Sequence, residues 1–119
     1  EADMVLSYTT SPAYHRIAET DDTKDWAPFD EGHYLQVEVA GILAGSDQPD
    51  LARAFLAFIQ GPEFQAVIPT TNWMYPAADV PLPEGFETAR QVVSLLLPAE
   101  QAAEVKQGAL AEWQAALSQ

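Results

Sequence analysis

The chain has 119 residues, of which 48% are hydrophobic, and its 18 acidic and 5 basic side chains give a formal net charge of −13. This balance argues against nucleic-acid binding, because phosphate backbones are bound by clustered lysine and arginine. The sequence has no cysteine, which excludes disulfides and cysteine-bound metals, and no apolar run reaches the roughly 20 residues of a membrane span.

The first segment predicts a strand that runs directly into a helix. Residues 1–7 contain an apolar run at 4–6, and Ser11-Pro12 is a typical helix start, with serine as the N-cap and proline as the first helical residue. Such a junction gathers hydroxyls, an aromatic ring and free backbone N–H groups where open α/β folds bind ligands. An ordinary strand–helix loop is the alternative interpretation.

Periodicity and turn residues divide the remainder of the chain into short elements. The expected helical and turn segments are a helix over 12–18, a polar loop over 20–25, a turn over 30–32, a helix over 49–60, a helix from Pro62 to Pro69 and a helix over 98–117. The expected extended segments are a strand over 33–40, an extended stretch over 70–75 closed by Pro76, a rigid turn over 81–83 onto which Phe86 docks, and an apolar patch over 92–97.

Catalytic and metal-binding motifs are not evident in this sequence. It contains no Gly-x-Ser-x-Gly elbow, no His-x-x-x-His pair and no glycine-rich phosphate loop, so we expect a protein that is not an enzyme. His15, His33 and Asp30 are conceivable metal ligands, but the two histidines are 18 residues apart along the chain and lack ligand spacing. Packing or solvent-exposed histidines are the better interpretation, and we expect no metal site.

Three segments of the chain carry a family resemblance. Residues 3–15 read Asp-Met-Val-Leu-Ser-Tyr-Thr-Thr-Ser-Pro-Ala-Tyr-His, residues 29–34 read Phe-Asp-Glu-Gly-His-Tyr, and residues 69–76 read Pro-Thr-Thr-Asn-Trp-Met-Tyr-Pro. In this order the segments resemble the C-terminal part of the periplasmic thiamine-binding proteins of bacterial ABC transporters, which belong to the type 2 periplasmic binding protein superfamily. The resemblance covers nearly the whole chain, but only about the last third of such a protein.

The resemblance implies an α/β fold in which this chain is the C-terminal segment of a two-lobed type 2 periplasmic binding protein. Strands crossing between the lobes and a helical C-terminal part are expected, with about 1–34 in one lobe and about 35–119 mainly in the other. The crossing would place Tyr34 and Glu38 near the hinge and the cleft. A missing N-terminal portion of the same protein would complete the fold and supply further ligand contacts.

The resemblance also implies a binding function. Thiamine, and with it the mono- and diphosphate esters, would be bound in the periplasm and delivered to an ABC transporter permease, as a ligand and without any cofactor. Thiamine carries a permanently cationic thiazolium ring, which an aromatic face attracts by about 0.5–2 kcal/mol. Residue by residue, the family's binding stretch and stacking aromatics correspond to Tyr8, Thr9, Thr10, Ser11, Tyr14 and Trp73.

The phosphate end of an ester has its own expected site. If Ser11 caps a helix whose first residue is Pro12, the N–H groups of Ala13 and Tyr14 are free at the positive end of the helix dipole. An anionic group would bind there without lysine or arginine.

Two alternatives to thiamine binding fit the same sequence. Aromatic and acidic groups would also suit another small cationic solute such as a polyamine. An acidic protein-interaction module is the alternative of a different class, in which the helices that carry Phe55, Phe58, Phe64 and Trp113 pack on a partner chain.

Overall fold

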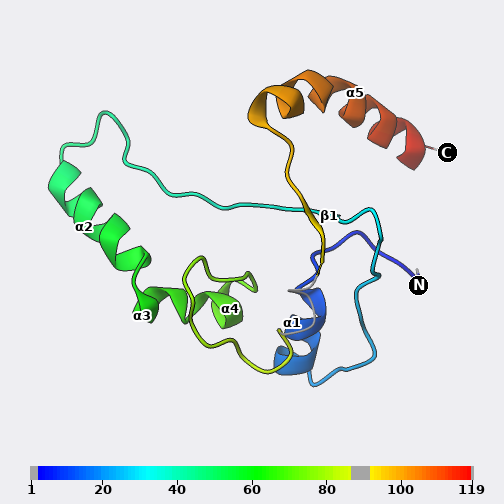
Figure 1. The fold of residues 1–119 in the computed structure, drawn as a ribbon, viewed down its shortest axis with the longest axis horizontal. Helices are drawn as coiled ribbons and strands as arrows, with labels where there is room; N and C mark the ends of the chain where they lie inside the picture. The colour runs from blue at the N-terminus through cyan, green and yellow to red at the C-terminus, as the bar shows by residue number, and fades with distance from the viewer. Residues whose placement is uncertain (1–2, 87–91, 119) are drawn as a thin grey trace.

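The computed structural model describes residues 3–86 and 92–118 as an open, elongated arrangement that measures 51 × 40 × 25 Å (Figure 1). The elements follow one another along the chain as α1 (Ser11–Ala18), β1 (His33–Tyr34), α2 (Pro49–Ile59), α3 (Pro62–Gln65), α4 (Ile68–Thr71), β2 (Ser94–Leu95) and α5 (Ala99–Leu117). Helices combined with a short sheet agree with an α/β class at this coarse level.

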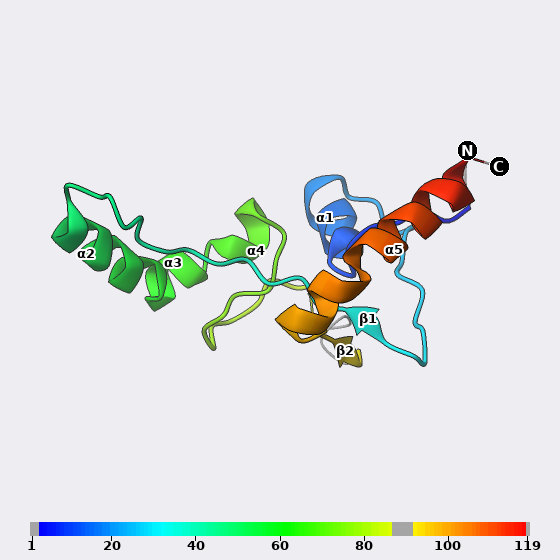
Figure 2. The same cartoon turned by 90° about the horizontal axis from the view of Figure 1, so that it is seen from above.

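The sheet consists of the two short strands β1 and β2, which pair in parallel with His33 opposite Ser94 and Tyr34 opposite Leu95 (Figure 2). The N–H of His33 donates to the carbonyl of Val93 at 2.8 Å. The predicted turn before β1 is present, and its Gly32 has φ +102°, where a Cβ would lie 2.6 Å from the Val93 carbonyl oxygen. Only glycine fits this close approach to β2.

The small core lies around α1 and the segment that leads to residue 86. Ala13, Val80 and Phe86 are its buried hydrophobic residues within the described ranges. Phe86 is 1% exposed, and the ring of Tyr75 packs edge-on against it at 5.7 Å between centroids. The Tyr75 hydroxyl donates to the Phe86 carbonyl at 2.6 Å, so Phe86 docks as predicted for the turn that precedes it.

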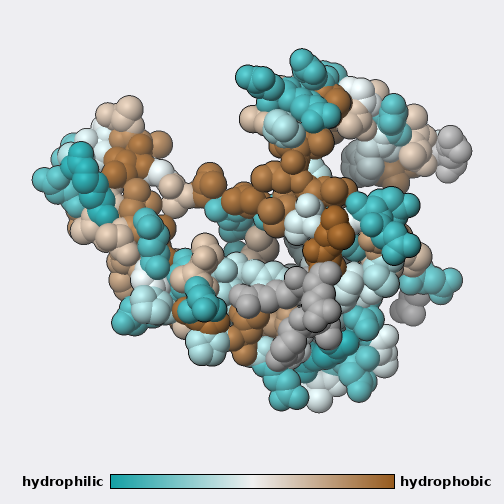
Figure 3. All heavy atoms as spheres, viewed as in Figure 1, coloured by the Kyte–Doolittle hydropathy of each residue, from teal (hydrophilic) through white to brown (hydrophobic). Residues whose placement is uncertain are grey.

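Much of the apolar surface is exposed. Phe55 and Phe58 on α2 and Trp113 on α5 are each 55% exposed, and the extended segment 35–43, which joins β1 toward α2, exposes several aliphatic side chains (Figures 1 and 3). Exposed apolar faces of this extent are the kind that other protein surfaces cover. Among the described helices, none has both the length and the apolar character needed to span a bilayer.

The predicted N-terminal strand is not formed. Residues 3–8 have no strand pairing, and Met4, Val5 and Leu6 are 69–94% exposed, while residues 1 and 2 of that prediction lie outside the described residues. The predicted strand over 33–40 is paired only at His33 and Tyr34. A strand needs a hydrogen-bonding neighbour as well as the right side-chain pattern. In the described structure the backbone bonds from 33–40 to the second strand end with the Leu35 N–H, which donates to the Leu95 carbonyl at 2.8 Å.

The helix predicted from Pro62 to Pro69 is divided into α3 and α4. Pro69 lies in the first turn of α4 instead of ending a helix, which is the position where a helix accommodates proline. Thr70 and Thr71 belong to α4, so the prediction of an extended stretch from 70 was wrong at its start. The predicted helices over 12–18, 49–60 and 98–117 are confirmed as α1, α2 and α5.

Candidate functional site

A pocket of about 400 Å³ lies between the start of α1, the extended segment after β1 and the end of α4. This volume is within the range of small-molecule sites. It is lined by Tyr8, Thr10, Ser11, Tyr14, Gln36, Glu38, Asn72, Trp73 and Met74. The structure therefore brings together five of the six predicted ligand residues around one pocket, and Thr9 is the one that does not line it.

Trp73 and Tyr14 form the aromatic wall of the pocket. Their rings pack edge to face, with centroids 5.0 Å apart and planes at 82°. Both side chains are half-buried, so part of each ring remains open toward the pocket. Tyr8 also lines the pocket and is 57% exposed. Three aromatic rings at one pocket are the arrangement that attracts an organic cation.

The backbone at Trp73 adopts a left-handed conformation, with φ +55°. Such a conformation is unfavourable for a bulky side chain and persists where neighbouring contacts hold it. The Thr10 hydroxyl donates to the Trp73 carbonyl at 2.6 Å, and Thr10 is only 6% exposed. This hydrogen bond therefore joins the two predicted ligand segments, 63 residues apart in sequence, and holds the peptide that carries the tryptophan.

The helix start differs from its prediction. α1 begins at Ser11 with Thr10 as the N-cap, and Pro12 is the second helical residue. The N–H of Ala13 donates to the Thr10 carbonyl at 3.1 Å, and that of Tyr14 donates to the same oxygen at 3.4 Å. The expectation that both N–H groups are free for an anion was wrong, because the Thr10 carbonyl closes the first turn one residue earlier than the Ser-Pro pair suggests.

The hydroxyl of Ser11 has a partner of its own. Its Oγ lies 2.8 Å from Oγ of Ser7, in the loop before α1. One hydroxyl of such a pair donates to the other, which leaves the second hydrogen available to an oxygen atom in the pocket. Ser11 lines the pocket, so where Ser7 donates to Ser11 the free hydrogen faces the pocket as a neutral donor and not as a charged anion site.

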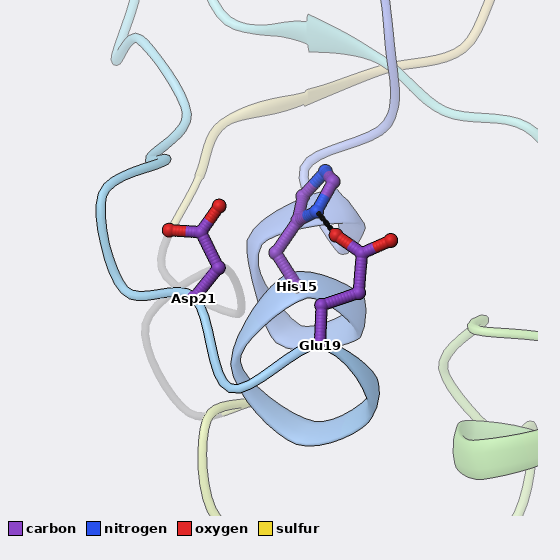
Figure 4. A group of neighbouring side chains, drawn as sticks. All are labelled: His15, Glu19 and Asp21. Carbon is purple, nitrogen blue, oxygen red and sulfur yellow. Dashed lines mark hydrogen bonds and ion pairs between the residues drawn. The ribbon is translucent and has the colours of Figure 1, made fainter.

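Glu19 forms hydrogen bonds with two side chains of α1, Tyr14 and His15, and Figure 4 shows the bond to His15. Its Oε1 accepts from the Tyr14 hydroxyl at 3.1 Å, and its Oε2 lies 2.6 Å from Nδ1 of His15. These hydrogen bonds, from His15 first and then from Tyr14, lower the pKa of Glu19, and the bond to the carboxylate raises the pKa of Tyr14. A hydrogen-bonded carboxylate thus orients one ring of the aromatic wall.

Asp21 lies near His15 and Glu19, close enough for one atom of each to approach a shared ion (Figure 4). Its carboxylate already accepts from the backbone and hydroxyl of Thr23 and pairs with the ammonium of Lys24. Those contacts, led by Lys24, hold the pKa of Asp21 far below its usual range. The carboxylates of this cluster are thus engaged by neighbouring side chains.

His33 is placed by packing. Its ring lies 5.4 Å from that of Trp26 and 5.5 Å from that of Phe29, measured between centroids. Its Nε2 accepts from the Phe29 N–H at 3.4 Å. The interpretation of this residue as a packing histidine agrees with these contacts.

Acidic solution is expected to release Tyr14 from Glu19. Because folding lowers the pKa of Glu19, its stabilising contribution is complete above the ordinary glutamate value of about 4.3 and is lost as the pH falls through the lowered value. We expect NMR signals of the Tyr14 ring to change with the titration of Glu19 in this acid range. In Glu19→Gln the same titration should leave the Tyr14 signals unchanged, whereas an identical acid response would assign the change to another group.

Four further residues line the pocket, and the predicted site did not include them. Asn72 and Met74 flank Trp73, so a wider window around the tryptophan would have found them. Gln36 and Glu38 come from the extended segment after β1, and Asn72 Nδ2 donates to Glu38 Oε2 at 3.1 Å. The resemblance placed Glu38 near the cleft, but no local pattern singled out Gln36.

Comparison with known proteins identifies relatives along the whole chain. It is 55% identical over 119 residues to a thiamine-binding periplasmic protein of Salmonella typhimurium, and 55% identical over 120 residues to one of Escherichia coli. A thiamine-binding periplasmic protein of Brucella abortus is 45% identical over 121 residues. The chain is homologous to thiamine-binding periplasmic proteins. Each of these alignments covers 99% of this chain and 36% of the relative.

The chain therefore spans about a third of the length of the curated relatives that it matches, as the resemblance implied. A search of protein-family models found none that matches, and a search of solved structures found none either. The relatives are named as binding proteins, in line with the expectation of a protein without a catalytic step.

Proposed function

We propose that this chain is the C-terminal part of a periplasmic solute-binding protein that binds thiamine and delivers it to an ABC transporter permease. The observation that carries the proposal is the pocket at which Tyr8, Tyr14 and Trp73 meet. The names of relatives that are 45–55% identical along this chain support thiamine as the ligand and the periplasm as the compartment.

The chemistry of the pocket suits the thiazolium ring. This ring is positive at every physiological pH, and aromatic faces attract it without any need for a proton. Tryptophan is the strongest such face, and half-burial of Trp73 strengthens the attraction because less water competes. Thr9, which lies outside the lining, is proposed to support the binding stretch and not to contact the ligand.

The lobe arrangement is part of the proposal. Residues 1–34 belong to one lobe, residues 35–119 belong mainly to the other, and the extended segment after β1 is the crossing between them. The exposed apolar faces of α2 and α5 support this arrangement, because the remaining portion of a two-lobed protein would bury them. That portion also supplies the opposite wall of the pocket.

Thiamine monophosphate and diphosphate are included among the proposed ligands. The Ser7 and Ser11 hydroxyl pair supports a contact to a phosphate oxygen from this chain. Charged contacts to the phosphate would come from the remaining portion of the protein, because Glu38 is the charged side chain that lines the described pocket.

Calorimetric titration of the complete protein tests the proposal. We expect saturable binding of thiamine with one site per chain, and much weaker binding of spermidine, which carries positive charge but no aromatic ring. Tight spermidine binding without thiamine binding would replace thiamine by a polyamine. Binding of neither solute, with self-association in sedimentation experiments, would favour a protein-interaction module.

A further inference from the structure

Glu38 is the one formally charged side chain among the described residues that line the pocket. It is exposed, and none of the salt bridges formed by the described residues includes it. Its neighbours in the lining are aromatic, amide, hydroxyl and thioether groups. The pocket therefore has a single negative charge that no cation of the described chain neutralises.

Asn72 fixes the place of this carboxylate. Its Nδ2 donates to Glu38 Oε2 at 3.1 Å, across 34 residues of sequence. Asn72 is the C-cap of α4 and directly precedes Trp73, so the hydrogen bond joins the extended segment after β1 to the peptide that carries the tryptophan. The amide occupies Oε2, while Oε1 has no recorded partner within the described part of the chain.

We propose that Glu38 is the counter-charge of the bound cation and determines the preference of the pocket for a positively charged ring over a neutral ring of the same shape. This role rests on the proposed function, which it deepens. A carboxylate that loses water when a ligand covers it is costly unless an opposite charge replaces the water. A permanent cation held against Trp73 supplies that charge, and a neutral ring does not.

Asn72 acts here as a positioning residue. An amide donor holds the carboxylate toward the aromatic wall without neutralising it, unlike the pairing that a lysine or arginine would make. Cation–π attraction and the carboxylate then act on the same ring from two parts of the chain. Together, the cation–π attraction and the carboxylate favour a cationic ring over a neutral ring of the same shape. The aromatic side chains alone would also bind neutral rings, through burial and stacking.

The test compares two ligands of one shape in the complete protein. Thiamine is titrated beside 3-deazathiamine, in which carbon replaces the positively charged ring nitrogen and the ring is a neutral thiophene. Glu38→Gln keeps an oxygen that can accept from Asn72 and removes only the charge. We expect this variant to bind thiamine about 10–100-fold more weakly and 3-deazathiamine within about 3-fold of the unchanged protein.

Glu104→Gln is the matched control, because it removes one acidic charge from the exposed surface of α5 and lies outside the pocket lining. It should change neither affinity by more than about 2-fold. Glu38→Gln with unchanged thiamine affinity, or with equal losses for both ligands, would overturn the role of Glu38 while leaving thiamine binding established. An unchanged protein that binds neither ligand would instead overturn the proposed function, and the role of Glu38 with it.

Discussion

Replacing Trp73 by alanine in the complete protein is expected to weaken thiamine binding by about 1–3 kcal/mol. The variant removes the ring that packs edge-on against Tyr14, together with its cation–π attraction for the thiazolium. Trp73→Phe should lose less, because an aromatic face remains, although phenylalanine attracts cations more weakly than tryptophan. Isothermal titration with thiamine measures both variants against the unchanged protein.

Trp113→Ala is the control for this experiment. Trp113 lies on α5 and does not line the pocket, so its removal should leave thiamine affinity within about 2-fold. Because the remaining portion of the protein is proposed to cover this face of α5, the variant should lower thermal stability instead. Unchanged affinity in Trp73→Ala would assign the tryptophan to packing alone. Trp73 also packs against the Tyr14 ring, so its removal can lower the stability of the fold as well as the affinity. Thermal unfolding of each variant should therefore be measured beside the titration.

The helices of this chain could be predicted because their signals are local. Pro49 and Asp50 open α2, with apolar residues at helical spacing behind them, and α5 starts directly after Pro98. The start of α1 was predicted to within one residue. Even so, because the N-cap is Thr10 and not Ser11, the N–H groups of Ala13 and Tyr14 are hydrogen-bonded to Thr10 instead of free. Helix boundaries are the least certain part of such predictions, and here one residue decided whether an anion site was expected.

Strands were predicted less well because pairing is not local. The apolar run at 4–6 has the composition of a strand, yet its side chains are exposed and its backbone is unpaired in the described structure. β1 and β2 pair across some 60 residues, and nothing in the apolar patch over 92–97 specified His33 as the partner of Ser94. Sequence patterns report the alternation of side chains, whereas a ladder depends on a second segment.

The candidate site likewise combines features that could be predicted from the sequence with features that depend on packing between distant segments. Resemblance gave the aromatic residues, and the structure gathers five of the six predicted positions, although their contact with ligand stays a prediction. The sequence could not predict two hydrogen bonds. The Thr10 hydroxyl donates to the Trp73 carbonyl, and the Asn72 side chain donates to the Glu38 carboxylate. Both are hydrogen bonds between segments more than 30 residues apart, and they depend on how the segments pack.

Replacing Gln65 by leucine is expected to destabilise the complete protein by about 2–4 kcal/mol. Gln65 is 7% exposed, and its Nε2 donates to the Ile59 carbonyl at 2.7 Å. Its Oε1 accepts from the N–H of Ala77 at 2.7 Å and from that of Ala78 at 3.3 Å. Leucine has a similar size but leaves these part-buried backbone groups without their partner, so the end of α2 and the segment 77–78 lose their link.

Urea unfolding with a common m-value measures this loss, and Gln60→Leu is the matched control. Gln60 is exposed, and its Nε2 donates to the Leu56 carbonyl at 3.0 Å within the same helical turn, where water replaces the lost donor. The control should therefore change stability by less than about 0.5–1 kcal/mol. Equal effects of the two substitutions would show that the Gln65 side chain fills space and that its three hydrogen bonds contribute little. If only Gln65→Leu loses stability, it should also lower thiamine affinity, because the anchored residues 77–78 lie within a few residues of Trp73 and Met74 in the pocket lining.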